Sequence, residues 1–125
     1  MKTILLAEDD PFILDIYFNQ FKKEGYKVDI AKDGQMALEK IRNNYPDLLV
    51  LDINLPKING VEILKTLKND PKTKNLKVIV LSNYDERGIS EKYNFDISTF
   101  EGIKFFLKVE ITPEEITRFV KEILK

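Results

Sequence analysis

Acidic side chains follow two apolar runs of this sequence, where they could bind a metal ion or act as nucleophiles. Glu8 and Asp9 come directly after the run "TILLA", and Asp52 closes the run "DLLVLD". An ionised carboxylate at the end of a buried strand costs free energy unless a partner compensates for its charge. If the two runs are neighbouring strands, three carboxylates meet in a small space and repel one another. A divalent cation would resolve this conflict, and Mg²⁺ is expected because it prefers carboxylate oxygens and keeps several waters, which leaves room for a phosphate group.

A hydroxyl group and an ammonium group end two further apolar runs. Ser82 closes "KVIVLS" and Lys108 closes "IKFFLK". Together with a bound cation, these two groups would form a cradle for a phosphate group. Asp52 is then the natural nucleophile, since a carboxylate can accept a phosphoryl group and become an acyl phosphate.

Short apolar runs alternate with helical patterns along the whole chain. The runs have the length of strands and span residues 3–7, 27–31, 47–52, 77–82 and 103–108. Before the last helical pattern, Thr112 and Glu115 have the spacing of a capping box. Such alternation predicts an α/β fold with a parallel sheet and helices on both faces. In open sheets of this kind ligands bind at the carboxyl ends of the strands, which is where the polar residues lie.

The composition limits the chemistry that the chain can perform. Its 125 residues suffice for a single domain over 1–125, and we expect no effector domain. The absence of cysteine and histidine excludes thiolate catalysis, histidine-based acid–base catalysis and most transition-metal sites. A net charge of −1 gives no reason to expect binding to nucleic acid or to an anionic membrane surface. The first apolar run is too short for a signal peptide or a membrane span, so we expect a cytoplasmic protein.

Taken in order, the motifs resemble the receiver domain of bacterial response regulators, the phosphoacceptor half of two-component signalling. The resemblance covers essentially the whole chain and rests on "ILLAEDDP", "AKDGQMALEKI", "PDLLVLDINLPKINGVEIL", "VIVLS" and "FFLK". It implies a stand-alone receiver with a flavodoxin-like, doubly wound, five-stranded parallel sheet of order 2-1-3-4-5. It also implies phosphoryl transfer from a sensor histidine kinase or a small phosphodonor, which would switch a face that binds an unidentified downstream protein.

The resemblance further implies a role for each residue of the site. The Mg²⁺ ligands would be Glu8, Asp9, Asp52 and the backbone carbonyl of Asn54. Asp52 would accept the phosphoryl group, and Lys108 would pair with it. Ser82 would turn to hydrogen-bond a phosphoryl oxygen once Asp52 is modified, and the ring of Phe105 would move inward with it, as the two parts of a switch.

The sequence departs from the family pattern at two places. Val109 follows Lys108, where the family has a proline that is commonly preceded by a cis bond. The cis form before a residue other than proline costs roughly 2.5–4 kcal/mol, so we expect a trans bond here and a Val109 side chain that points outward. The segment between Ser82 and Lys108 is several residues longer than usual and contains poor helix formers, so its helix should be short, shifted or irregular. Within it, Tyr84 is expected to shield the acyl phosphate from water.

Two other functions are compatible with parts of this pattern. One is a degenerate receiver that acts as a constitutive docking module. The other is a phosphatase of the haloacid dehalogenase type, although its chemistry needs a second acid two residues after the nucleophile, where this sequence has Asn54. Single residues also have structural interpretations: Asp10 is expected to cap a helix, and Phe105 could simply be a core aromatic.

Overall fold

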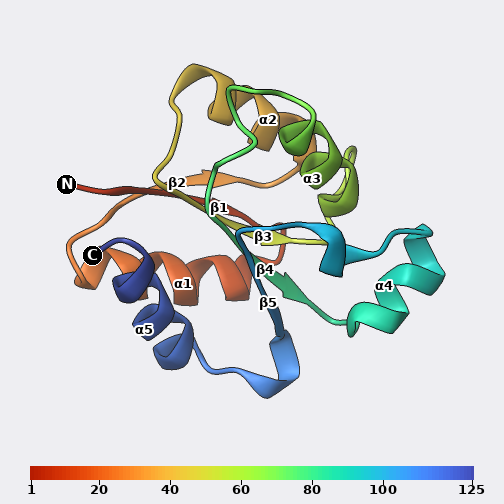
Figure 1. Ribbon diagram of the computed structural model, residues 1–125. Coiled ribbons are helices and arrows are strands. Elements are labelled where there is room, and N and C mark those ends of the chain that lie inside the picture. Colours follow the sequence, from red (N-terminus) through yellow and green to blue (C-terminus); the bar gives the residue numbers. More distant parts are fainter.

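The computed structural model describes residues 1–125 and shows one sheet with helices on both of its faces (Figure 1). The strands are β1 (Thr3–Ala7), β2 (Lys27–Ala31), β3 (Leu48–Asp52), β4 (Val78–Ser82) and β5 (Ile103–Leu107). The helices are α1 (Pro11–Lys23), α2 (Gly34–Asn43), α3 (Gly60–Lys68), α4 (Glu86–Tyr93) and α5 (Pro113–Ile123), with short 3-10 helices η1 (Ile97–Thr99) and η2 (Lys108–Glu110). All neighbouring strands are parallel and their order is β2-β1-β3-β4-β5. The predicted flavodoxin-like topology is confirmed.

Alternate residues of each inner strand face two separate hydrophobic cores. In β1, Leu5 and Ala7 belong to the core under α2, α3 and α4, whereas Ile4 and Leu6 belong to the core under α1 and α5. Figure 1 shows α2 and α3 on one side of the sheet and α1 and α5 on the other. Every residue of β3 and β4 is buried, as is usual for parallel strands that are covered on both faces. The carboxyl ends of these strands are therefore held firmly at one edge of the sheet.

Side-chain caps fix where the helices beside that edge begin. Oδ1 of Asp10 accepts a hydrogen bond of 2.9 Å from the backbone N–H of Phe12, so the predicted cap of α1 is confirmed. Thr112 and Glu115 form the predicted capping box of α5, with two reciprocal bonds of 3.1 Å. None of the helices combines the length and the apolar composition that crossing a membrane requires.

The long segment between β4 and β5 forms a short helix and an irregular return. Helix α4 has eight residues and ends at Tyr93, and the residue after it, Asn94, caps it with a φ of 50° in the left-handed region. The return then packs on α3 through the aromatic rings of Phe95 and Phe100. Nζ of Lys65 lies 5.4 Å from the first ring centre, and Nζ of Lys68 lies 4.6 Å from the second. The fourth helix was expected to be short, shifted or irregular, and the structure shows that it is short.

Strand β5 ends one residue earlier than predicted. Leu107 is its last residue and pairs with Ser82, so Lys108 opens η2 instead of closing the strand. Ser82 is also the last residue of β4, so Lys108 has no residue of β4 to pair with, and the chain turns into η2. The structure has no cis peptide bond, which confirms the expected trans bond between Lys108 and Val109. The side chain of Val109 points outward and is 85% exposed.

Candidate functional site

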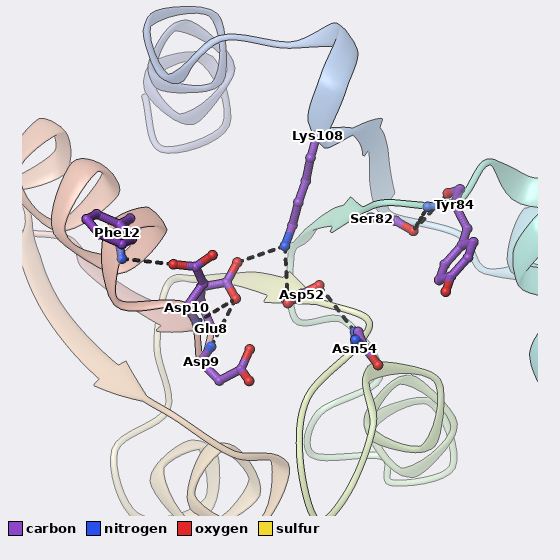
Figure 2. Close-up of polar contacts among 9 residues, drawn as sticks. All are labelled: Glu8, Asp9, Asp10, Phe12, Asp52, Asn54, Ser82, Tyr84 and Lys108. Atoms are coloured by element: carbon purple, nitrogen blue, oxygen red, sulfur yellow. Dashed lines mark hydrogen bonds and ion pairs between the residues drawn. The ribbon is translucent and has the colours of Figure 1, made fainter.

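Three carboxylates meet at the carboxyl ends of β1 and β3. Ala7 pairs with Leu51 in the sheet, so the next residue of each chain segment, Glu8 and Asp52, emerges at the same level. Oxygens of Glu8, Asp9 and Asp52 lie within 4.8 Å of one another (Figure 2). Glu8 is only 2% exposed and Asp52 4%, whereas Asp9 is exposed to solvent. The structure therefore brings together the three acids that were predicted from the sequence.

The ammonium group of Lys108 lies between the two buried acids. Its Nζ is 3.0 Å from Oε1 of Glu8 and 3.2 Å from Oδ2 of Asp52 (Figure 2). Burial alone would lower the pKa of Lys108, but the negative charges of Asp52 and Glu8 outweigh it and the pKa is raised. Lys108 is therefore charged at neutral pH. It reaches the site as expected, although it lies beyond the end of β5.

Glu8 is fixed in the turn that follows β1. Its Oε2 accepts hydrogen bonds from the backbone N–H groups of Asp9 and Asp10, at 3.0 and 3.2 Å. Burial, followed by the hydrogen bond and the charge of Asp52, raises the pKa of Glu8 to about 7 against the opposite effect of Lys108. One ammonium group thus does not fully compensate two buried carboxylates, and the site favours a further positive charge.

The donor atoms of the site fit a hard divalent cation. Glu8, Asp9 and Asp52 offer only carboxylate oxygens, which are the ligands that Mg²⁺ prefers. Asn54 belongs to the same turn as Asp52, because its backbone N–H donates a hydrogen bond of 3.2 Å to Oδ1 of Asp52. The three acids could therefore hold a cation, with the backbone of Asn54 beside them.

Two glycines allow the loop after Asp52 to pack closely against its surroundings. The N–H of Gly60 donates to the carbonyl of Ile53 at 2.7 Å, and a Cβ atom at Gly60 would lie 2.6 Å from Cα of Ile53. A Cβ atom at Gly34, at the start of α2, would overlap with the carbonyl oxygen of Ile58. A side chain at either position would displace the loop that begins at Asp52.

Ser82 lies at the predicted place, but its hydroxyl is turned away from the acids. Oγ donates a hydrogen bond of 2.8 Å to the carbonyl of Tyr84 and accepts one of 2.9 Å from the N–H of the same residue. Figure 2 shows this pair beside the cluster of Asp52 and Lys108. The side chain of Phe105 is half-buried and packs against the core under α2, α3 and α4. In this state Ser82 and Phe105 lie outside the hydrogen-bonded cluster of acids and lysine.

Lys92 of α4 contacts this end of the site but was not among the residues predicted from the sequence. Its ammonium group donates a hydrogen bond of 3.0 Å to the hydroxyl of Tyr84. The sequence carries no clear signal for this contact, because Tyr84 precedes Asp85, the N-cap of α4, and so lies outside the helix that carries Lys92.

Comparison with known proteins gives a consistent result over nearly the whole chain. Residues 4–117 match the model of the response regulator receiver domain. The chain is 29% identical over 91 residues to the polar-differentiation response regulator DivK of Brucella ovis, covering 73% of this chain and 74% of DivK. It is 30% identical over 124 residues to the alkaline phosphatase synthesis transcriptional regulatory protein PhoP of Bacillus subtilis, covering 99% of this chain and 49% of PhoP.

Solved structures agree with these sequence matches. A putative response regulator from Chloroflexus aurantiacus J-10-fl has a TM-score of 0.81 and 31% identity, over 98% of this chain and 97% of that one. The chemotaxis response regulator CheY4 of Vibrio cholerae has a TM-score of 0.82 over 98% of both chains. Because the sequence identity is only 21%, the comparison with CheY4 supports the fold alone.

Proposed function

The chain belongs to the response regulator receiver domain family, and from this premise we propose that it is a phosphorylation switch in which Asp52 accepts a phosphoryl group in a Mg²⁺-dependent reaction. Receiver domains of response regulators accept phosphate from histidine kinases, so the donor would be a sensor histidine kinase or a small phosphodonor. One observation carries the proposal: buried Asp52 lies beside Glu8 and Asp9, with the ammonium of Lys108 at 3.2 Å.

In the proposed reaction, a carboxylate oxygen of Asp52 attacks the phosphorus atom of the donor. A P–O bond to Asp52 forms as the P–N bond of phosphohistidine or the P–O bond of acetyl phosphate breaks, and the electron pair leaves with the imidazole or the acetate. Glu8, Asp9, Asp52 and the backbone carbonyl of Asn54 would hold the cation. A bound Mg²⁺ would supply positive charge that stabilises the oxygens of the group in transit.

Lys108 is the residue that we expect to respond first to the new charge. Its Nζ already lies within ion-pair distance of Asp52, so a phosphoryl oxygen on Asp52 becomes an additional acceptor for it. The charge that Lys108 now shares between Glu8 and Asp52 would then shift toward the phosphoryl group. The negative charge of the other buried acid, Glu8, would then be compensated mainly by the bound cation.

The conformational change that follows phosphorylation would begin at Ser82, the last residue of β4. The hydroxyl of Ser82 would leave its two hydrogen bonds with Tyr84 and turn to a phosphoryl oxygen, and Phe105 would follow it inward. A local change of charge of this kind can bias a two-state element and alter a binding face. We propose that residues 1–125 act as one receiver unit whose modified form engages a protein partner.

Incubation with acetyl phosphate tests the proposal. With Mg²⁺, intact-protein mass spectrometry should show the uptake of one phosphoryl group, and Asp52→Asn should abolish it. Asp10→Asn serves as a matched control, because asparagine also caps a helix and the variant should be phosphorylated like the wild type.

The other two functions predict different results in this experiment, or in the same incubation with a phosphomonoester in place of acetyl phosphate. A constitutive docking module takes up no phosphoryl group with or without Mg²⁺. A phosphatase turns over a phosphomonoester substrate without accumulating a stable acyl phosphate. Either result would overturn the proposed function.

A further inference from the structure

The backbone of Tyr84 is hydrogen-bonded to the hydroxyl group of Ser82. The carbonyl of Tyr84 accepts the proton of the Ser82 hydroxyl, and the N–H of Tyr84 donates to the same oxygen. A rotation of the Ser82 side chain toward Asp52 breaks both bonds at once. Such a rotation would therefore remove the two contacts by which Ser82 holds the backbone of Tyr84.

The side chain of Tyr84 is held separately, on one face of α4. Nζ of Lys92 donates a hydrogen bond of 3.0 Å to the Tyr84 hydroxyl and lies 4.7 Å from the ring centre. One turn earlier, Gly88 lets the aromatic side chain approach the helix: a Cβ atom at Gly88 would lie 3.1 Å from Cβ and 3.5 Å from Cδ1 of Tyr84. The hydrogen bond to Tyr84 also raises the pKa of Lys92. The Tyr84 ring thus lies against Gly88 and Lys92, which are one turn apart on α4.

This arrangement keeps the ring away from the acid that is modified. In Figure 2 the Tyr84 ring lies beyond Ser82, on the side away from Asp52. The side chain is 37% exposed, so apart from its contacts with α4 it has room to move. The shielding of Asp52 that was expected from the sequence therefore requires the ring to leave Lys92.

We propose that Lys92 is a positioning residue for the phosphoacceptor site, which holds the Tyr84 ring on α4 and so keeps phosphorylated Asp52 open to water. The inference rests on the proposed function, because it concerns the lifetime of the acyl phosphate. In hydrolysis a water oxygen bonds to phosphorus, the P–O bond to Asp52 breaks, and inorganic phosphate leaves. A ring released from Lys92 can move inward with Ser82 and obstruct that water.

The decay of the acyl phosphate tests this role directly. We expect Lys92→Met to slow decay by about two- to fivefold, the size of effect that one exposed cation–π contact supports. Lys92→Arg keeps a cation beside the ring and should restore the wild-type rate. Arg87→Met is the matched control, because Arg87 is an exposed cation of the same helix that pairs with Glu91 and should leave the rate unchanged.

A double-variant comparison separates positioning from a general effect of charge. If Lys92 acts through the ring, Lys92→Met should have no effect on decay in a Tyr84→Ala background. Equal slowing in both backgrounds would contradict the inference, as would an unchanged or faster decay of Lys92→Met alone. A chain that takes up no phosphoryl group at all would instead contradict the proposed function and the inference with it.

A measurement on the unphosphorylated chain tests the contact by itself. Nuclear Overhauser effects should connect the Tyr84 ring protons to the α protons of Gly88 and to the side chain of Lys92. In Lys92→Met the effects to Gly88 should weaken as the ring leaves the helix. Their absence from the wild type, or their full retention in Lys92→Met, would overturn the positioning role whatever the outcome of phosphorylation.

Discussion

The ammonium nitrogen of Lys108 lies 3.2 Å from Oδ2 of Asp52 and is also 3.0 Å from Oε1 of Glu8. These three groups come from the ends of three different strands of the sheet, and two of them are acids that are almost fully buried. The same lysine therefore compensates the charge of both buried acids, and under the proposed function it would also pair with a phosphoryl group on Asp52.

Replacing Lys108 should destabilise the metal-free chain. Lys108→Met leaves two buried carboxylates without their ammonium partner, and such a loss costs about 3 kcal/mol. Urea unfolding in the presence of a chelator measures the change, and added Mg²⁺ should restore part of it. Lys104→Met is the matched control, because Lys104 is an exposed residue of β5, and it should change the stability by less than about 0.5 kcal/mol. Equal stabilities of the two variants would refute the role of the ion pairs.

Replacing Asp9 should weaken Mg²⁺ binding while leaving the fold intact. Asp9→Asn removes one of the three carboxylates but alters only an exposed side chain. Calorimetric titration should show a dissociation constant higher by about tenfold or more, equivalent to ~1.4 kcal/mol. Asp15→Asn changes the charge equally on the exposed face of α1 and should leave the constant unchanged. An affinity of Asp9→Asn equal to that of the wild type would remove Asp9 from the ligand set.

A side chain at Gly34 should disturb the loop that follows Asp52. Gly34→Ala places a methyl group against the carbonyl of Ile58, so either the loop or the start of α2 must move. We expect a loss of about 2 kcal/mol in the free energy of unfolding, as for other overpacked sites. Gln35→Ala, at the next and exposed position of α2, should cost less than about 0.5 kcal/mol. Equal urea midpoints for the two variants would argue against close packing at Gly34.

Tyr17 should make the fold sensitive to alkaline pH. Burial, then the charges of Glu8 and Glu114, raises the pKa of Tyr17 from 10.0 to about 12. The folded state thus binds this proton more tightly, so the contribution of Tyr17 to stability is complete below pH 10 and is lost as the pH rises through 12. Tyr17→Phe keeps the ring but cannot ionise, and thermal unfolding should show a smaller loss of stability across this range. Parallel stability curves for both proteins would contradict the prediction.

The fold and the place of the site could be predicted because both follow from strong, repeated signals. Apolar runs of strand length alternate with helical patterns, and a parallel sheet brings the ends of its strands to one edge. Asp52 and Glu8 meet for this reason, since their positions depend only on which strands are neighbours. The trans bond before Val109 was predictable for an equally simple reason, the energetic cost of the alternative.

The orientations of single side chains were not predictable in the same way. The hydroxyl of Ser82 bonds to Tyr84 instead of pointing toward Asp52, and this orientation depends on a rotamer and a local turn. The contact between Tyr84 and Lys92 depends on where α4 begins after its cap. Each of these orientations is held by one or two hydrogen bonds, each worth about 0.5–1.5 kcal/mol, and so small a contribution leaves no pattern in the sequence.

Locating the phosphoryl group tests the role of Asp52 most directly. After incubation with acetyl phosphate and Mg²⁺, borohydride reduction converts an aspartyl phosphate into homoserine, which peptide mass spectrometry can place in the chain. We predict homoserine at position 52, only when Mg²⁺ is present and not in Asp52→Asn. Modification at Glu8, Asp9 or any other residue, or no modification in a chain that binds Mg²⁺, would contradict the assignment of Asp52 as the phosphoacceptor.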